Sequence, residues 1–261
     1  MPIHLPEGLR ILEEREFKQI TYEVMEIAFA VHNEMGCLFD ELIYKQAIAQ
    51  RYRDCRMELP IQVVAGTFSK TYYLDLLVGG GAPFEFKAAQ FIVERHRAQF
   101  LNYLLLAELP HGKLVNFRGH LLEHEFINAT WTRKQRTSFE VEDRDYKPMS
   151  SPGSDLKPII LDFLRDWGTC LDVELYQQAA VHFLGDQHAI TPVEIFCGGA
   201  KVGCQKLHLL SPDTTLCISV LNDGLDRYEA QLRRLLKHTN LRATQWVNIG
   251  RKLVEFKTLY R

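Results

Sequence analysis

The sequence predicts an α/β protein built from two tandem domains, each a mixed β-sheet flanked by helices. Three observations lead to this prediction: helix and strand patterns alternate along the first half, an internal repeat links the two halves, and a short Ser/Pro/Gly segment separates them. We expect the first domain to span residues 1–148, the linker 149–155 and the second domain 156–261.

Two helices are expected to open the first half. Apolar residues recur at helical spacing from Phe17 to Met35, and Gly36 follows as a stop signal. A second helical stretch covers about Asp40 to Arg53, and a long one covers about Glu94 to Glu108. The expected strands are 61–65, 71–78 and 83–87 before the long helix, and 113–117 and 121–126 after it. Strands, a helix and a returning strand in this order predict a mixed sheet.

The second half repeats the first at one constant offset, which we call the repeat shift. It carries Gly36 onto Gly168 and, without gaps, Tyr44 onto Tyr176, Pro60 onto Pro192, Gly66 onto Gly198, Gln99 onto Gln231 and Asn116 onto Asn248. Because the matches cluster in corresponding helices and strands, we interpret the chain as a tandem duplication. Asn116 recurs in the second copy, so we assign it to hydrogen bonding at a strand end.

The composition is that of an ordinary globular protein, with 46% hydrophobic and 25% charged residues. The polar start of the chain does not resemble a signal peptide, and no apolar run approaches a membrane span, so we expect a cytoplasmic protein without a membrane partner. Its six cysteines form no C-x-x-C pair and are expected to be reduced thiols. A net charge of −2 restricts any attraction to nucleic acid to local patches.

An acidic pair on an apolar hairpin is the main candidate for chemistry. Asp75 lies in one predicted strand, and Glu85 and Lys87 project from one face of the next. A turn through residues 79–81 brings Asp75 alongside them. Since burying an unpaired carboxylate is unfavourable, something must compensate the pair. Two carboxylates and an ammonium can hold a hard divalent cation beside a phosphodiester, whereas the alternative is a structural salt bridge.

Two polar stripes flank this hairpin. Glu41 and Tyr44 lie three apart on the upstream helix, and Gln99 and Tyr103 lie four apart on the downstream one. His32 and His96 also lie on predicted helices, where packing or capping is the expected role.

The second copy lacks these groups. The repeat shift replaces Glu41 by Val173, Asp75 by Leu207, Glu85 by Cys217, Lys87 by Ser219 and Tyr103 by Leu235. A copy that keeps the fold could not readily lose both carboxylates if the fold required them. The loss therefore favours a chemical role over the alternative, which is drift of a surface salt bridge.

The motifs resemble a known superfamily. Asp75, then Glu85-Phe86-Lys87, then Gln99 through Tyr103 resemble the PD-(D/E)XK nuclease core with the Q-x-x-x-Y motif of RecB-like members. Residues 31–44, with 96–99 and 114–117, are similar to the GxxExxY proteins, although Leu38 replaces the second glycine. The resemblance covers about residues 17–126 and implies a restriction-endonuclease-like fold for both domains, the second being degenerate.

The resemblance also implies a set of roles. Asp75 and Glu85, with the Phe86 carbonyl and Glu41 directly or through water, would bind Mg²⁺ or Mn²⁺. Lys87 would orient or help deprotonate the attacking water, or neutralise charge in the transition state, and the nearby carboxylates favour the last of these roles. Gln99 and Tyr103 would position the phosphate or the water, and simple packing on the sheet is an equal alternative for Tyr103.

These inferences leave several functions open. The first is a nuclease that acts on nucleic acid, DNA ahead of RNA, with its active site in the N-terminal domain only. The second is a non-catalytic nucleic-acid-binding or assembly module with a vestigial site, and the third a hydrolase of another phosphate ester. The second domain is expected either to pack as a pseudo-dimer partner or to offer a basic surface from Arg233, Arg234 and Lys237.

Overall fold

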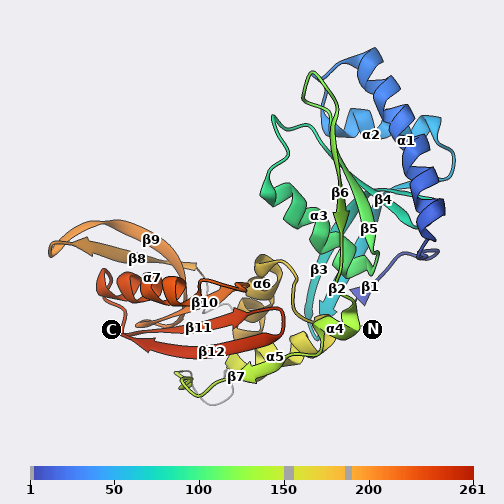
Figure 1. The fold of residues 1–261 in the computed structure, drawn as a ribbon. Helices are drawn as coiled ribbons and strands as arrows, with labels where there is room; N and C mark the ends of the chain where they lie inside the picture. Colours follow the sequence, from blue (N-terminus) through green and yellow to red (C-terminus); the bar gives the residue numbers. More distant parts are fainter. Residues whose placement is uncertain (1–2, 150–155, 186–189) are drawn as a thin grey trace. The chain divides into compact units, whose positions relative to one another are not determined.

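The computed structural model describes residues 3–149, 156–185 and 190–261, and the chain divides into two compact units, Met1–Thr132 and Arg133–Arg261 (Figure 1). Each unit contains a six-stranded mixed sheet with helices beside it. This confirms the predicted α/β class with two mixed sheets.

The N-terminal unit follows the predicted order of elements, preceded by one additional short strand. Its elements are β1 (Ile3–His4), α1 (Glu14–Met35), α2 (Glu41–Arg51), β2 (Cys55–Ala65), β3 (Phe68–Val78), β4 (Ala82–Lys87), α3 (Glu94–Ala107), β5 (His111–Asn116) and β6 (Glu123–Asn128). The sheet order is β1-β2-β3-β4-β5-β6, and the parallel pair in it is β4 with β5. The crossover helix α3 connects this parallel pair.

The turn between β3 and β4 has the conformation that its glycines were expected to allow. Gly79 and Gly80 adopt positive φ angles of 57° and 72°. At Gly81 an added Cβ would lie 2.3 Å from the Arg10 carbonyl oxygen, so only glycine lets the preceding chain pass this closely. Apolar residues of α1, among them Val24 and Ala28, are fully buried in the core that this unit forms with the sheet.

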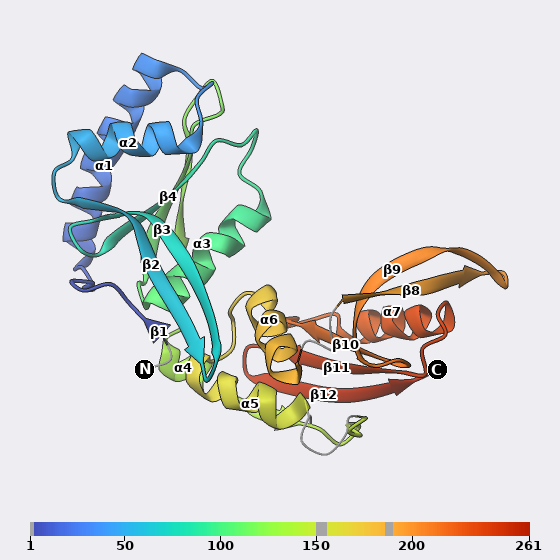
Figure 2. The same ribbon diagram turned by 180° about the vertical axis from the view of Figure 1, so that it is seen from behind.

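The C-terminal unit contains a closely similar series. Its elements are α4 (Arg133–Arg136), β7 (Glu140–Glu142), α5 (Leu156–Trp167), α6 (Val173–Leu184), β8 (Ile190–Cys197), β9 (Ala200–Ser211), β10 (Thr214–Ser219), α7 (Leu225–Lys237), β11 (Ala243–Ile249) and β12 (Leu253–Tyr260) (Figure 2). The sheet order is β7-β12-β11-β10-β9-β8, and β10 and β11 form the central parallel pair.

Strand registers in the two units agree under the repeat shift for β4–β5 and β5–β6, whereas residues 190–195 of β8 pair with β9 one position away from the register of β2 with β3. In the parallel pairs, Phe84 lies opposite Lys113 and Leu216 lies opposite Gln245. In the antiparallel pairs that follow, Leu114 lies opposite Glu125 and Trp246 opposite Lys257. The repeat is thus not only a matter of sequence, because equivalent residues occupy equivalent places in two separate sheets.

A buried tyrosine makes the same hydrogen bonds in both units. Tyr44 Oη donates to the Gly36 carbonyl at 2.7 Å, and Tyr176 Oη donates to the Gly168 carbonyl at the same distance. Both hydroxyls also accept an amide hydrogen from the loop that precedes their helix. The tyrosine therefore serves helix entry in both units.

Asn116 also has a structural role that recurs. Its side chain accepts from the Ala89 amide at 3.0 Å and donates to the Ala89 carbonyl at 2.8 Å. Asn248, its counterpart under the repeat shift, makes the same two bonds with Leu221. The predicted hydrogen bonding at the strand end is confirmed.

The division between the units falls earlier than the predicted boundary at residue 148. Strand β7 pairs in parallel with β12, and the Arg136 guanidinium donates to the Trp167 carbonyl at 2.6 Å. These contacts place residues 133–149 in the C-terminal unit, and composition gives no sign of such long-range pairing. Of the predicted linker, residues 150–155 lie outside the described part of the chain.

The structure bears on two expectations from the composition, the absence of a membrane-spanning segment and the state of the cysteines. Among the described helices, none combines the length and the apolar character that a bilayer crossing requires. All six cysteines are free in the structure.

Candidate active site

Strands β3 and β4 bring the two predicted metal-binding carboxylates together. The antiparallel register pairs Leu76 with Phe84, so Asp75 and Glu85 follow at the next position on the two strands. Asp75 Oδ2 accepts the Phe86 amide hydrogen at 2.8 Å. Asp75 and Glu85 expose only 7% and 1% of their surface. The hairpin thus buries two acidic side chains next to one another.

Lys87 and Glu41 are the other two predicted members of the acidic site, and they lie next to Glu85. Lys87 Nζ lies 2.7 Å from Glu85 Oε1 and 3.8 Å from Glu41 Oε2. Glu41 is the first residue of α2, so the start of this helix delivers its carboxylate to the end of β4. The salt bridge between Lys87 and Glu85, which the sequence left open as the alternative to a cation site, is therefore present.

Lys45 is a member of the site that the sequence analysis missed. Its Nζ donates to Asp75 Oδ1 at 2.6 Å and also to the Glu58 carboxylate, and the side chain is 4% exposed. A signal was available, because Lys45 follows Glu41 by four residues and shares its helix face. We call the six residues Glu41, Lys45, Glu58, Asp75, Glu85 and Lys87 the charged cluster.

Glu58 reaches Lys45 through an unusual backbone conformation. It lies in β2 between the residues that pair with Leu76 and Leu74 of β3, which places it opposite Asp75. Its φ angle is 52°, in the left-handed region that residues with a Cβ seldom adopt. Such conformations cost free energy and concentrate at functional sites. The strain is here associated with an ion pair between the buried Lys45 and the exposed Glu58.

Burial is the largest single influence on the pKa values of Glu41, Lys45, Glu85 and Lys87 in the charged cluster. The pKa of Glu85 is raised to about 8; burial is the largest cause, the nearby Asp75 charge adds to it, and Lys87 acts in the opposite direction. Burial also raises the pKa of Glu41. For Lys45 and Lys87 burial works to lower the pKa, but the carboxylates outweigh it and the net direction is upward. Both ammonium groups stay charged at neutral pH.

One oxygen of this cluster has no partner. Glu85 Oε2 is buried and accepts no hydrogen bond from any described residue. An isolated buried carboxylate oxygen is unfavourable unless a proton, a donor or a cation compensates it. The donor set around it consists of hard oxygens, which suit Mg²⁺ or Mn²⁺.

The cluster offers a pair of carboxylates and not a cage of three. Within residues 3–149, 156–185 and 190–261, no group of three or more His, Cys, Asp or Glu side chains is arranged to hold a metal ion. Mg²⁺ is nevertheless commonly bound through one or two carboxylates, with water and substrate phosphate completing its shell. Asp75 and Glu85 therefore fit such an ion, and Glu41 is held towards Lys87.

Helix α3 places the predicted Gln99 and Tyr103 together. Gln99 Nε2 donates to Tyr103 Oη at 2.8 Å, and Gln99 is exposed. The Tyr103 ring lies 5.6 Å from that of Tyr72 on β3, which is the packing on the sheet that the sequence left open. Burial raises the pKa of Tyr103, and the charge of Glu85 adds to this shift. The pair thus borders the charged cluster.

His96 acts in capping, as predicted, and His32 contacts a loop. His96 Nδ1 accepts the Val93 amide hydrogen at the start of α3, at 3.3 Å. His32 Nε2 lies 2.9 Å from the Gly119 carbonyl oxygen.

The C-terminal unit fills the equivalent position with apolar side chains. Leu207 and Cys217, which replace Asp75 and Glu85, pack in a cluster with Trp246. Cys217 Sγ lies 3.2 Å from a tyrosine hydroxyl, and Ser219, in place of Lys87, accepts from Trp246 Nε1 at 2.8 Å. No carboxylate remains at these equivalent positions.

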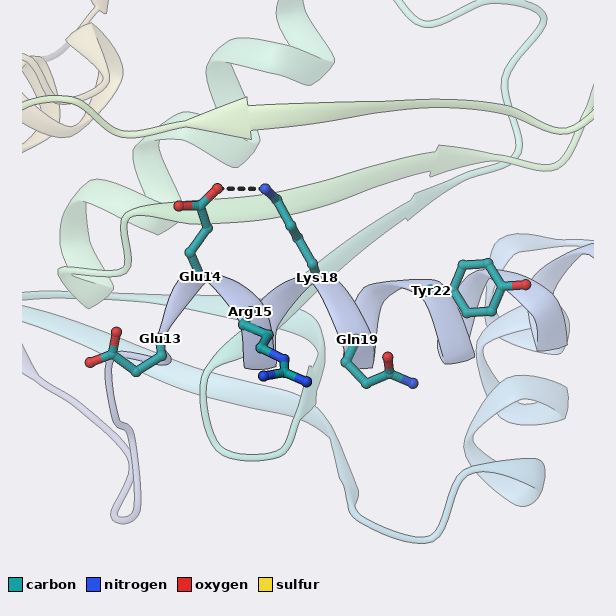
Figure 3. A pocket seen from close by; sticks show the side chains of 6 residues that line it. All are labelled: Glu13, Glu14, Arg15, Lys18, Gln19 and Tyr22. Atoms are coloured by element: carbon teal, nitrogen blue, oxygen red, sulfur yellow. Dashed lines mark hydrogen bonds and ion pairs between the residues drawn. The ribbon is translucent and has the colours of Figure 1, made fainter.

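The cavity shown in Figure 3 lies elsewhere. It is a shallow depression on the outer face of α1, crossed by the Glu14–Lys18 ion pair, and lined by Glu13, Glu14, Arg15, Lys18, Gln19 and Tyr22. None of these residues belongs to the charged cluster. The candidate active site is therefore identified by its buried charged side chains, Asp75 and Glu85, and not by this cavity.

Comparison with known proteins assigns the class of the N-terminal half. Residues 18–129 match the model of the PD-(D/E)XK nuclease superfamily, so this half contains a PD-(D/E)XK domain. Among solved structures, the chain matches the crystal structure of SSO0001 with 14% identity and a TM-score of 0.29. That match covers 46% of this chain and 61% of the other, less than two thirds of its length. No curated protein matches the chain.

Proposed function

We propose that the N-terminal unit is a Mg²⁺- or Mn²⁺-dependent nuclease of the GxxExxY type that hydrolyses phosphodiester bonds in nucleic acid, with DNA expected ahead of RNA. The observation that carries this proposal is the buried Asp75–Glu85 pair with an unpartnered oxygen, inside a domain that matches a nuclease superfamily. The C-terminal unit is, on this proposal, a degenerate copy from a tandem duplication.

The residues of the site have distinct roles in the proposal. Asp75, Glu85 and the Phe86 carbonyl would hold the ion, and Glu41 would contribute through water. The chemistry that the ion supplies is Lewis-acid polarisation of a phosphoryl oxygen and of the attacking water.

Lys87 would stabilise the negative charge that develops on the phosphoryl group. Its pKa is raised, so it is an ammonium at neutral pH and a poor general base. Gln99 donates its amide hydrogen to Tyr103 and would position the phosphate with it.

The C-terminal unit supports the assignment by contrast. It keeps the registers of the central parallel pair and of the antiparallel pair that follows, and it keeps the tyrosine and asparagine hydrogen bonds, but it has lost Glu41, Lys45, Asp75, Glu85 and Lys87. Features that serve the fold are thus retained, whereas the charged cluster is absent. This pattern favours a chemical role for the cluster.

The test is hydrolysis of labelled single- and double-stranded DNA and RNA with Mg²⁺ or Mn²⁺. We expect cleavage by the wild type, with losses of about 100-fold or more in Glu85→Gln and Lys87→Met, because each removes charge stabilisation in the transition state. Cys217→Ser and Lys201→Met in the C-terminal unit are the controls and should retain activity. Equal activity in all variants would rule out this site. An inert wild type that still binds nucleic acid would favour the non-catalytic module.

A further inference from the structure

A group of exposed apolar side chains lies on three loops that adjoin the charged cluster. They are Leu38, Phe39, Leu42, Phe91, Val93 and Leu121, which expose between 42% and 84% of their surface, and we call them the apolar rim. Single exposed apolar residues need no explanation, but a contiguous group is typical of an interaction site.

Hydrogen bonds join the three loops that carry the apolar rim. Arg118 donates to the Ala88 carbonyl at 3.3 Å and to the Leu38 carbonyl at 3.5 Å. The Ile92 amide donates to Glu123 at 3.1 Å. Both ribbon views place these loops, between α1 and α2, β4 and α3, and β5 and β6, at one end of the unit (Figures 1 and 2).

The apolar rim is continuous with the charged cluster. Leu42 directly follows Glu41 at the start of α2, and the loop with Phe91 begins after Lys87. The Phe117 amide, which precedes the loop with Leu121, donates to the Lys87 carbonyl at 2.8 Å. A ligand at Lys87 would therefore extend over the apolar rim.

The equivalent loops of the C-terminal unit do not form such a rim. The repeat shift replaces Leu42 by Glu174 and Phe91 by Asp223, and Leu171, in place of Phe39, is buried. Of the apolar counterparts, Leu253, in place of Leu121, remains exposed. The apolar rim is thus absent from the unit that lacks the carboxylates. This joint absence links the apolar rim to the proposed reaction.

We infer that the apolar rim binds the bases of an unpaired nucleic-acid strand, so that single-stranded segments are the substrate class; this inference rests on the proposed nuclease function. A duplex turns its charged phosphates outwards and keeps its bases stacked, so it offers much less apolar surface to these loops than an unpaired strand does. Unpaired bases stack on aromatic side chains such as Phe39 and Phe91. Arg118 adds positive charge, since its hydrogen bonds within the described residues go to carbonyls and not to carboxylates.

The test is fluorescence anisotropy in EDTA with a labelled 20-nucleotide DNA strand, the same RNA strand and the blunt DNA duplex, at several salt concentrations. We expect the wild type to bind the DNA strand at least about 10-fold more tightly than the duplex. Phe91→Asp and Leu42→Glu, which introduce the residues of the C-terminal unit, should weaken single-strand binding by about 10-fold each. Tyr22→Asp is the matched control, because Tyr22 is 62% and Phe91 63% exposed and Tyr22 lies on the outer face of α1 (Figure 3).

The inference is overturned if duplex binds as tightly as single strand, or if Phe91→Asp and Tyr22→Asp have equal effects. It is also overturned if the apolar rim instead controls self-association in sedimentation experiments. Circular dichroism and thermal unfolding verify that the variants fold. Binding is measured without metal, so it can be separated from cleavage. If the protein binds single strands but cleaves nothing, the proposed reaction is refuted and the inferred binding surface is still supported.

Discussion

The Asp75 carboxylate accepts the main-chain amide hydrogen of Phe86 at 2.8 Å, directly beside Glu85 on the same strand. The side chain of one candidate ligand therefore holds the backbone of the other. The other oxygen of Asp75 accepts a hydrogen bond from Lys45. Both oxygens of Asp75 are therefore fixed, whereas one oxygen of Glu85 has no partner among the described residues. The site is organised before any ion arrives, and several measurements follow from this.

Stability without metal should depend on pH through Glu85. Burial raises the pKa of Glu85 from 4.5 to about 8, so between these values the folded state holds a proton that the unfolded state has lost. The contribution of Glu85 to the free energy of unfolding should therefore fall as pH rises from about 5 to 8, by up to about 1.4 kcal/mol per pH unit. Urea titrations of wild type and Glu85→Gln measure it, because other titrations cancel in the difference. Parallel pH curves for the two proteins would contradict the shift.

Removing Lys45 should destabilise the N-terminal unit. Lys45→Met leaves the buried Asp75 without its cation, and breaking a buried pair from one side costs about 3–5 kcal/mol. Lys18→Met is the control, because its pair with Glu14 is exposed and screened by solvent, so its loss should leave the stability nearly unchanged. Chemical denaturation measures both changes.

A double variant separates charge compensation from packing at the same place. Lys45→Met combined with Asp75→Leu removes both charges and should regain part of the lost stability, since no carboxylate is left uncompensated. If the double variant is no more stable than Lys45→Met, the lysine acts by packing and not by compensating Asp75.

The repeated tyrosine should contribute similarly in both units. Tyr44→Phe and Tyr176→Phe each remove one donated and one accepted hydrogen bond, with an expected loss of about 1–3 kcal/mol of local stability. Hydrogen exchange of peptides from α2 and α6 reports the two units separately. A large effect in one unit and none in the other would show that the equivalence is only geometric.

Gly112 should tolerate no side chain. A Cβ at this position of β5 would lie 2.3 Å from Cζ of Phe100, so Gly112→Ala must displace the buried Phe100 ring or helix α3 that carries it and should cost about 1–3 kcal/mol. Hydrolysis should fall as well, because α3 carries Gln99 and Tyr103. Gly203→Ala is the matched control, since an added Cβ there has no neighbour within 4 Å. Thermal unfolding should separate the two variants, and equal midpoints would count against this packing constraint.

Much of the fold was predictable because its signals are local. Helical spacing before Gly36 and the glycine turn at 79–81 each depend on neighbouring residues, and most of the observed helix and strand bounds lie within a few residues of those expected. The boundary between the units was not predictable, because β7 belongs to the C-terminal sheet through pairing with a strand far along the chain, at the other end of the unit.

By itself, the sequence determined the repeat, the order of elements and the meeting of Asp75, Glu85 and Lys87 on one hairpin, since all of these follow from periodicity and short turns. Only the tertiary structure decided that Lys45 binds Asp75, that Glu58 adopts a left-handed conformation to reach this lysine, and that Glu85 retains an unpartnered oxygen. The physical reason is that charge compensation depends on distance and burial in the folded chain, and neither is encoded in the spacing of residues along it.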